Sequence, residues 1–156
     1  MKRKIYNVLL PVLPVILTAL LGSFFMMIGK VDYDTLSKPL FSPNKIVFPI
    51  AWSILYILIA ISGYLYLNNA ESKEDRIKGL TIYYIGLVIN AFWTFLFFTL
   101  DLKLFAAIWL GLLYIVSASN YVIFYKKSKK SGYLLIPYLI WLLFALYLNV
   151  GTVILN

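Results

Sequence analysis

The sequence predicts an all-α integral membrane protein, a bundle of five transmembrane helices with a structured first loop that acts as a lid. Hydrophobic residues make up 63% of the 156-residue chain and charged residues 13%, whereas soluble domains average about 50% and about 25%. The mean hydropathy is +0.90. Apolar runs long enough to cross a bilayer recur along the chain, and their continuity argues against the alternating pattern of a membrane β-barrel.

The predicted helices account for most of a single domain over residues 1–156. Each is close to or longer than the roughly 20 residues that cross a bilayer. We place them at residues 5–29, 46–68, 79–100, 104–125 and 133–154.

The first helix follows three basic residues, as the apolar core of a signal peptide also does. Its apolar run is longer than that of a typical signal peptide, and no A-x-A-like cleavage site follows it. We therefore expect it to be retained as a transmembrane helix.

The loop after the first helix is too rich in rigid and apolar residues to serve only as a connection. It has the sequence GKVDYDTLSKPLFSPNKIVFP, with prolines throughout and the aromatic residues Tyr33, Phe41 and Phe48. Loops of this kind often carry function, and we expect a lid over one end of the bundle. The alternative is an interfacial anchor, whose aromatic rings sit at the level of the lipid headgroups.

The second and third helices each carry aromatic residues at helical spacing. In the second, Phe48, Trp52 and Tyr56 recur at i, i+4 and i+8 and face one way. In the third, Asn90 and Trp93 lie at i and i+3. Tryptophans this far inside a span need a protein or ligand partner for the indole N–H. The pattern indicates either an aromatic-lined cavity or ordinary aromatic packing between helices.

The other connections are shorter than the first loop. Asp101-Leu102-Lys103 joins the third and fourth helices so tightly that the two must be adjacent and antiparallel. Residues 68–78 and 126–132 are rich in charge, and we expect plain solvated loops there.

The fifth helix carries the same kind of face as the second and third. Tyr138, Trp141, Ala145 and Asn149 follow at i, i+3, i+7 and i+11. Pro137 either kinks the helix beside Trp141 or marks its first turn. We expect Asn149 to bond this helix to its neighbours.

The basic residues predict the orientation of the chain. Most of the 14 Lys and Arg residues fall on the side of the N-terminus. The positive-inside rule then places the N-terminus in the cytoplasm and the C-terminus outside a membrane that we take to be the bacterial cytoplasmic membrane. We interpret the net charge of +8 as a topology signal, with an anionic-lipid contact as the second interpretation, and we expect no nucleic-acid partner. The residues on this side are Lys2, Arg3, Lys4, Lys73, Arg76, Lys78, Lys126, Lys127, Lys129 and Lys130.

Several chemistries lack the residues that they need. The chain has no Cys and no His, so thiolate nucleophiles, the usual general base and the commonest metal ligands are all missing. No Asp, Glu, Lys or Arg lies inside the predicted spans, which argues against an ion-driven transporter. We predict no metal site and no required cofactor.

Three stretches of the sequence together resemble the translocator protein family, also called tryptophan-rich sensory proteins or peripheral-type benzodiazepine receptors. The first runs from Tyr33 through Lys38-Pro39 to Trp52 and Tyr56. The second is Asn90-x-x-Trp93-x-x-x-Phe97-Phe98, and the third runs from Leu135 to Asn149. They occur in order, and the resemblance covers residues 10–156.

The resemblance implies a five-helix bundle, commonly a homodimer, with a pocket beneath the first loop. Family members bind porphyrins such as protoporphyrin IX, and also benzodiazepine-type and isoquinoline carboxamide ligands. For bacterial members it also implies light-dependent porphyrin breakdown, with Trp52 and Trp141 as the implicated residues. The positions that match the family's pocket are Tyr33, Pro43, Trp52, Asn90, Trp93, Trp141, Phe144 and Ala145.

We expect a membrane receptor or sensor whose partners are porphyrins, other hydrophobic small molecules and membrane lipid. Two alternatives stay open. One is an enzyme that degrades porphyrin with light and oxygen, in which the absorbing substrate supplies the excitation. The other is a translocator of porphyrin or lipid, although five helices do not divide into an inverted repeat and no coupling-ion site is visible.

Overall fold

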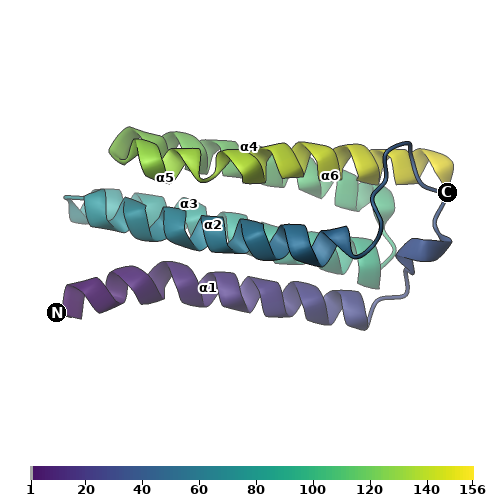
Figure 1. Cartoon of the computed structure of the whole chain (residues 1–156), viewed down its shortest axis with the longest axis horizontal. Helices are drawn as coiled ribbons and strands as arrows, with labels where there is room; N and C mark the ends of the chain where they lie inside the picture. The colour runs from purple at the N-terminus through teal and green to yellow at the C-terminus, as the bar shows by residue number, and fades with distance from the viewer. Residues whose placement is uncertain (1) are drawn as a thin grey trace.

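Long helices lie side by side along one axis in the computed structural model of the chain, which describes residues 2–156 (Figure 1). The predicted domain begins at Met1, which lies outside the described residues, and side chains are described from Lys4 onward. The described residues form helices and loops without a strand, so the predicted all-α fold is confirmed. The elements are α1 (Lys2–Met27), η1 (Tyr33–Thr35), α2 (Val47–Asn69), α3 (Lys73–Thr94), the π-helix η2 (Phe95–Thr99), α4 (Lys103–Lys127), α5 (Lys129–Tyr133) and α6 (Ile136–Leu155).

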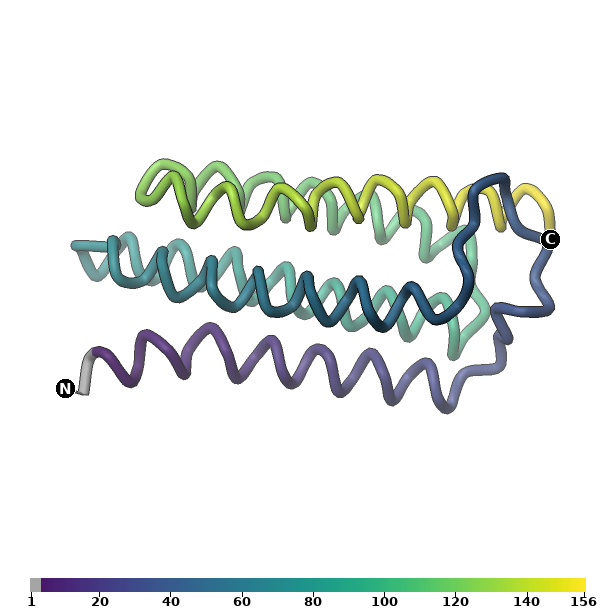
Figure 2. The backbone as a smooth tube through the Cα atoms, viewed as in Figure 1, coloured from purple at the N-terminus to yellow at the C-terminus, as the bar shows by residue number. Residues whose placement is uncertain are grey.

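The helices form a ring that is tightly packed except at one seam. α1 packs between α2 and α3, and α4 packs between α3 and α6. The predicted adjacency of the third and fourth spans is therefore confirmed. α2 and α6 meet over only a small area. Figure 2 shows that the N-terminus and the C-terminus lie at opposite ends of the bundle, and that the long loop (residues 28–46) crosses the end where the C-terminus lies. We call this end the loop end and the opposite one the N-terminal end.

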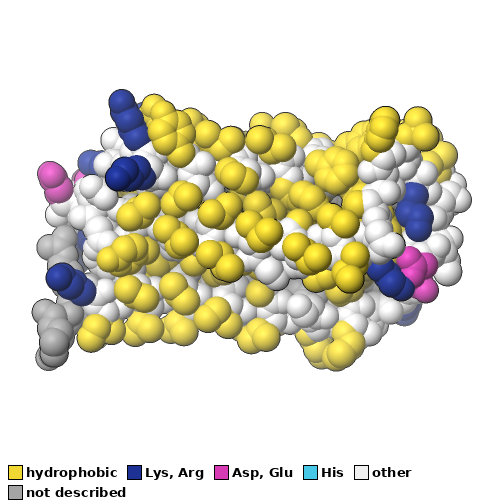
Figure 3. Space-filling view, viewed as in Figure 1, with side chains coloured by type: hydrophobic (Ala, Val, Ile, Leu, Met, Phe, Trp, Pro, Cys, Tyr) yellow, Lys and Arg dark blue, Asp and Glu magenta, His cyan; other side chains and the backbone are white. Residues whose placement is uncertain are grey.

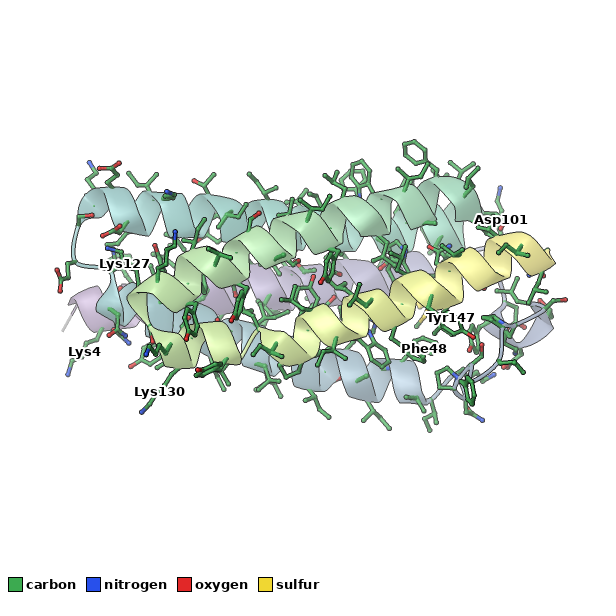
Figure 4. The ribbon with its side chains drawn as sticks, turned by 90° about the horizontal axis from the view of Figure 1, so that it is seen from above. Lys4, Phe48, Asp101, Lys127, Lys130 and Tyr147 are labelled. Carbon is green, nitrogen blue, oxygen red and sulfur yellow. The ribbon has the colours of Figure 1, made fainter. Side chains whose placement is uncertain are left out.

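The surface of the bundle matches a bilayer. Five helical stretches are long and apolar enough to cross a membrane, with mean hydropathies of 1.7 to 2.3. In Figure 3 apolar side chains cover the middle of the molecule, while charged side chains gather at its two ends. Figure 4 places Lys4, Lys127 and Lys130 at the N-terminal end and Asp101 at the loop end. The chain is an integral membrane protein.

The third helix begins earlier than the sequence predicts. α3 begins at Lys73, so most of the expected solvated loop at residues 68–78 is helical. Ser72 caps this helix, because its side chain accepts a hydrogen bond from the backbone N–H of Asp75 (3.0 Å). Glu74 and Asp75 lie in the first turn, where negative charge favours the helix dipole. The predicted loop was wrong because its charge pattern is also that of a helix start.

The predicted solvated loop at residues 126–132 was also wrong. α4 continues to Lys127, and Ser128 alone separates it from α5. Ser131 is fully buried and exchanges hydrogen bonds with Ser62 of α2, each hydroxyl donating to the other residue's carbonyl at 2.7 Å. This segment therefore fastens α5 to the C-terminal half of α2, at the N-terminal end of the bundle.

Pro137 marks the first turn of a helix. α5 ends at Tyr133, a turn follows, and α6 begins at Ile136 with Pro137 in its first positions. A proline there removes no hydrogen bond from a helix interior. Leu135, in the turn between α5 and α6, is buried.

The close approach of α3 to α2 depends on Gly79. A Cβ at this position would lie 2.1 Å from Cε1 of Tyr66. Tyr66 has little freedom to move aside, because its ring stacks on Phe124 with centroids 4.2 Å apart and its hydroxyl donates to the carbonyl of Asp75 (2.6 Å). Gly111 offers the opposite case, since a Cβ there meets nothing within 4 Å.

We expect Gly79→Ala to lower the free energy of unfolding by about 1–3 kcal/mol, the range for overpacking a filled interior. Gly111→Ala should leave stability unchanged or raise it by about 0.5–1 kcal/mol, because alanine is the better helix former. Thermal unfolding followed by circular dichroism in one detergent measures both. Equal melting temperatures for the two variants would show that α3 and α2 are not packed as closely as described.

Candidate functional site

A cavity of about 690 Å³ opens within the bundle at the loop end. This volume lies within the range of ~300–1,000 Å³ that is typical of small-molecule sites. Its walls come from α1, α2, α3, η2 and α6, and the long loop covers one side. The lining residues are Ala19, Gly22, Ser23, Met26, Gly29, Lys30, Val31, Asp32, Tyr33, Lys45, Ile46, Phe48, Pro49, Trp52, Tyr56, Trp93, Thr94, Phe97, Phe98, Ala145, Leu148, Asn149 and Thr152.

Aromatic side chains form two walls of the cavity. On α2, the ring centroid of Trp52 lies 5.4 Å from that of Tyr56, as the predicted stripe requires. On α3, the ring of Trp93 lies 6.4 Å from that of Trp52 and 5.8 Å from that of Phe97, with interplanar angles of 35° and 31°. Because the π-helix η2 adds a residue to its turn, Phe97 and Phe98 both reach the lining.

A hydrogen-bonded group lies behind the deep end of the cavity. The hydroxyl of Tyr56 donates to Oδ1 of Asn90 at 3.2 Å, and Nδ2 of Asn90 donates to the hydroxyl of Tyr138 at 2.9 Å. Asn90 is only 1% exposed. It therefore joins α2, α3 and α6 and does not itself line the cavity.

A second hydrogen-bonded relay runs through Asn149. Nε1 of Trp93 donates to Oδ1 of Asn149 at 3.2 Å, and Nδ2 of Asn149 donates to the carbonyl of Lys103 at 2.9 Å. The expectation that Asn149 bonds its helix to neighbours is confirmed, since the relay joins α6 to α3 and to the start of α4. Asn149 also lines the cavity, which the sequence did not indicate.

The long loop is fastened to the bundle at its start and folded on itself by its own side chains. The backbone N–H groups of Lys30 and Val31 both donate to the carbonyl of Phe98, at 2.9 and 3.2 Å. The Tyr33 hydroxyl donates to the carbonyl of Pro43 at 2.9 Å. Burial raises the pKa of the Tyr33 phenol above its usual value, so this hydroxyl remains a donor at neutral pH.

The far part of the loop is held by α6. The side-chain amide of Asn156 accepts from the N–H of Ser37 (3.0 Å) and donates to the carbonyl of the same residue (2.9 Å). The Tyr147 hydroxyl donates to the carbonyl of Leu40 at 2.8 Å, and Figure 4 shows Tyr147 and Phe48 near the loop. Phe41, by contrast, is 88% exposed and adopts a φ of 63°. The loop thus has one face bonded to the bundle and an exposed aromatic tip, and the expected lid stays a prediction.

The structure brings together half of the eight residues predicted to line the site. Tyr33, Trp52, Trp93 and Ala145 line the cavity. Pro43 and Asn90 do not line it, but each is hydrogen-bonded to a tyrosine that does, Tyr33 and Tyr56 respectively.

The remaining two predicted residues, Trp141 and Phe144, line a shallower apolar groove on the seam between α2 and α6. Trp141 stands directly behind the cavity wall, because its ring contacts Trp52 edge to face with centroids 6.4 Å apart. Its Nε1 is buried and has no hydrogen-bond partner among the described residues. Trp141 thus separates the groove from the cavity.

Sequence reasoning missed most of the contributions from α1 and from the end of α6. Ala19, Gly22 and Ser23 form a strip of small residues at i, i+3 and i+4, and this strip leaves room for the cavity. Thr152 lies three residues after Asn149 and faces the same way. Small-residue spacing at helical period was the available signal, but such spacing is equally common where helices simply pack closely.

The lining is suited to binding a flat apolar molecule by stacking and burial. Its polar groups are few and mostly neutral, and its charged side chains lie where the long loop meets the cavity: Lys30, Asp32 and Lys45. Lys45 forms an ion pair with Asp34, whose hydrogen bond and charge raise the pKa of the Lys45 amine. Among the described residues, no three His, Cys, Asp or Glu side chains gather closely enough to hold a metal ion.

Comparison with known proteins gives consistent similarities over nearly the whole chain. Residues 9–155 match the TspO/MBR family. Tryptophan-rich protein TspO from Archaeoglobus fulgidus is 36% identical over 146 residues, covering 93% of this chain and 94% of the relative. Protein CrtK from Rhodobacter capsulatus is 35% identical over 124 residues, covering 80% and 78%. Tryptophan-rich protein TspO from Chlorobaculum tepidum is 33% identical over 124 residues, with the same coverage.

We expect Asn156→Ala to loosen the long loop without disturbing the helices. The substitution removes both hydrogen bonds to Ser37, each worth about 0.5–1.5 kcal/mol. Amide hydrogen exchange at residues 36–42 should become faster, while exchange in α2 and α3 stays the same. Asn69→Ala is the matched control, because the Asn69 side chain bonds only within its own helix. Unchanged loop exchange in Asn156→Ala would show that α6 does not hold the loop.

Proposed function

This chain belongs to the TspO/MBR family, and we propose that it is a membrane receptor or sensor that binds tetrapyrroles such as protoporphyrin IX in the cavity at its loop end. Benzodiazepine-type and isoquinoline carboxamide molecules are ligands of the same site. The observation that carries the proposal is the cavity itself, walled by aromatic side chains from α2, α3 and η2.

The shape and chemistry of the cavity support ligands that are flat and mostly apolar. The rings of Trp52, Trp93 and Phe97 supply faces for stacking, and their burial against a ligand supplies most of the affinity. Among the lining residues, Tyr56, Asn149 and Thr152 are neutral polar groups able to orient a bound molecule. Because the chain has no His or Cys, the receptor binds metal-free porphyrin without an axial ligand, and iron adds little affinity.

In this proposal the long loop acts as a lid. Ligand exchange requires the loop to lift from α6, which breaks the bonds that Asn156 and Tyr147 make with it. Its exposed tip at Phe41 rests among lipid headgroups when the lid is closed. The lid lies on the outer side of a bacterial cytoplasmic membrane, because the basic N-terminal end faces the cytoplasm and its anionic lipids.

A homodimer completes the proposed receptor, through a helix face away from the cavity. Gly111 on α4 has open space where a side chain would be. Close approach of a second copy is compatible with such a position.

A second candidate function is light-dependent degradation of the bound porphyrin. The observation that favours it is the contact among three indoles, with Trp52 lying 6.4 Å from both Trp93 and Trp141. A porphyrin in the cavity would contact Trp52 directly, and an excited porphyrin can accept an electron from an indole. Oxygen is then the co-substrate, and the absorbing ligand makes acid–base side chains unnecessary.

Titration with protoporphyrin IX in the dark tests the receptor proposal. We expect saturable quenching of tryptophan fluorescence, and we expect Trp52→Leu to weaken binding by roughly two- to tenfold, since an aromatic pair contributes about 0.5–1.5 kcal/mol beyond its buried area. Trp109→Phe is the matched control, because Trp109 lies outside the cavity lining and donates to the carbonyl of Ile89. Quenching that never saturates would contradict the proposal, as would equal weakening in both variants.

Illumination of the same samples tests the second candidate. A new absorbing product should form with the unmutated protein and with Trp109→Phe, in light and oxygen. Trp52→Phe and Trp141→Phe should bind porphyrin and form little product, because they lack the indole donors. Porphyrin loss at the same rate with denatured protein would instead indicate simple photobleaching.

A further inference from the structure

The lysines at the loop end of the bundle differ in whether their ammonium group already has a carboxylate or carbonyl partner. Lys45 pairs with Asp34, and Lys103 pairs with Asp101. Lys38 donates to the carbonyl of Tyr33 at 3.1 Å, and its ammonium group lies 4.6 Å from the centroid of that ring.

Lys30 is the exception among these lysines. Within the described part of the chain, its side chain has no ion-pair partner and makes no hydrogen bond, yet it lines the cavity. The carboxylate that lines the cavity, that of Asp32, accepts the backbone N–H of Asp34 at 3.0 Å, and its charge contributes to the raised pKa of Lys45. Asp34 is thus paired with Lys45, and the ammonium group of Lys30 has no carboxylate within ion-pair distance among the described residues.

The backbone of Lys30 is held firmly in place. Its N–H donates to the carbonyl of Phe98 at 2.9 Å, and the next N–H along the chain, that of Val31, donates to the same oxygen. The preceding residue, Gly29, is so close that a Cβ there would lie 2.7 Å from that oxygen. The lysine is thus anchored to η2, the element that also carries Phe97 and Phe98 into the lining.

A ligand that fills this cavity meets an apolar interior and, where the loop begins, one unpaired cation. The polar groups that α2 and α6 contribute to the lining, including Tyr56 and Asn149, are neutral. A molecule with a flat apolar body and an anionic group on one edge matches both parts of the cavity. A neutral molecule of the same body leaves Lys30 unpaired.

We propose that Lys30 is an anion subsite at the edge of the cavity, which pairs with a carboxylate on the ligand and selects carboxylate-bearing ligands over their neutral esters. This subsite rests on the proposed receptor function, and a propionate of a porphyrin is the group that it would take. The interaction is exposed to solvent, so salt weakens it.

The test compares protoporphyrin IX with its dimethyl ester in dark titrations of the detergent-purified protein and its Lys30→Gln variant. We expect Lys30→Gln to weaken binding of the free acid by about fivefold, the upper range for an exposed ion pair, and to change binding of the ester by less than twofold. Lys30→Glu should weaken the acid further and spare the ester. Added salt should weaken the acid with the unmutated protein and have little effect with Lys30→Gln.

Lys103→Gln is the matched control, because it removes a lysine at the same end of the bundle that does not line the cavity. It should bind both compounds as the unmutated protein does. Equal weakening of acid and ester by Lys30→Gln would overturn the subsite and indicate a structural role for Lys30. Unchanged binding of the acid would overturn it as well.

The same titration separates this inference from the receptor function on which it rests. If both compounds bind saturably and Lys30→Gln has no selective effect, only the subsite fails. If neither compound binds saturably to the unmutated protein, the receptor function fails and the subsite fails with it.

Discussion

The hydrogen bond from Trp93 to Asn149 is the interaction on which the rest of the site depends. It sets the indole of α3 against α6, and the second hydrogen bond of Asn149, to the carbonyl of Lys103, fixes the same point to the start of α4. Inside a bilayer no water is available to replace a lost hydrogen bond, so a polar side chain keeps its protein partner. With Trp93 fixed, Trp52 of α2 packs against it with ring centroids 6.4 Å apart, and both rings line the cavity.

The cavity exists because neighbouring helices do not pack equally tightly all around the ring. α1, α3 and α4 pack along their lengths, whereas α2 and α6 meet over a small area. At the N-terminal end the gap is closed by the reciprocal bonds of Ser62 and Ser131. Among the described residues no direct hydrogen bond joins α2 to α6 at the loop end, and the long loop, held to η2 and α6, contributes residues to the cavity lining. The cavity and the long loop thus lie at the same end of the bundle.

Much of the fold and part of the site could be predicted from the sequence. The spans follow from hydropathy, because a bilayer requires long apolar helices, and the stripe of Trp52 and Tyr56 follows from helical period. The sequence does not predict that Trp141 lies in the groove and not in the cavity, because a ring at the α2–α6 seam packs equally well against either side. The burial of Ser131 could not be predicted either. It depends on hydrogen bonds to Ser62, which lies far away in the sequence, whereas the residues around Ser131 are charged. The π-helix that exposes Phe98 to the cavity leaves no periodic signal of its own.

The most direct test of the account is nuclear magnetic resonance of the protein labelled with ¹⁵N at its four tryptophan indoles, recorded in the dark before and after addition of protoporphyrin IX. The ring current of a porphyrin shifts only nearby nuclei, so each indole reports its own distance from the ligand. The account predicts large shifts for Trp52 and Trp93, which line the cavity, and an unmoved signal for Trp109. The largest shift at Trp109, or no shift at any indole under saturating porphyrin, would contradict it.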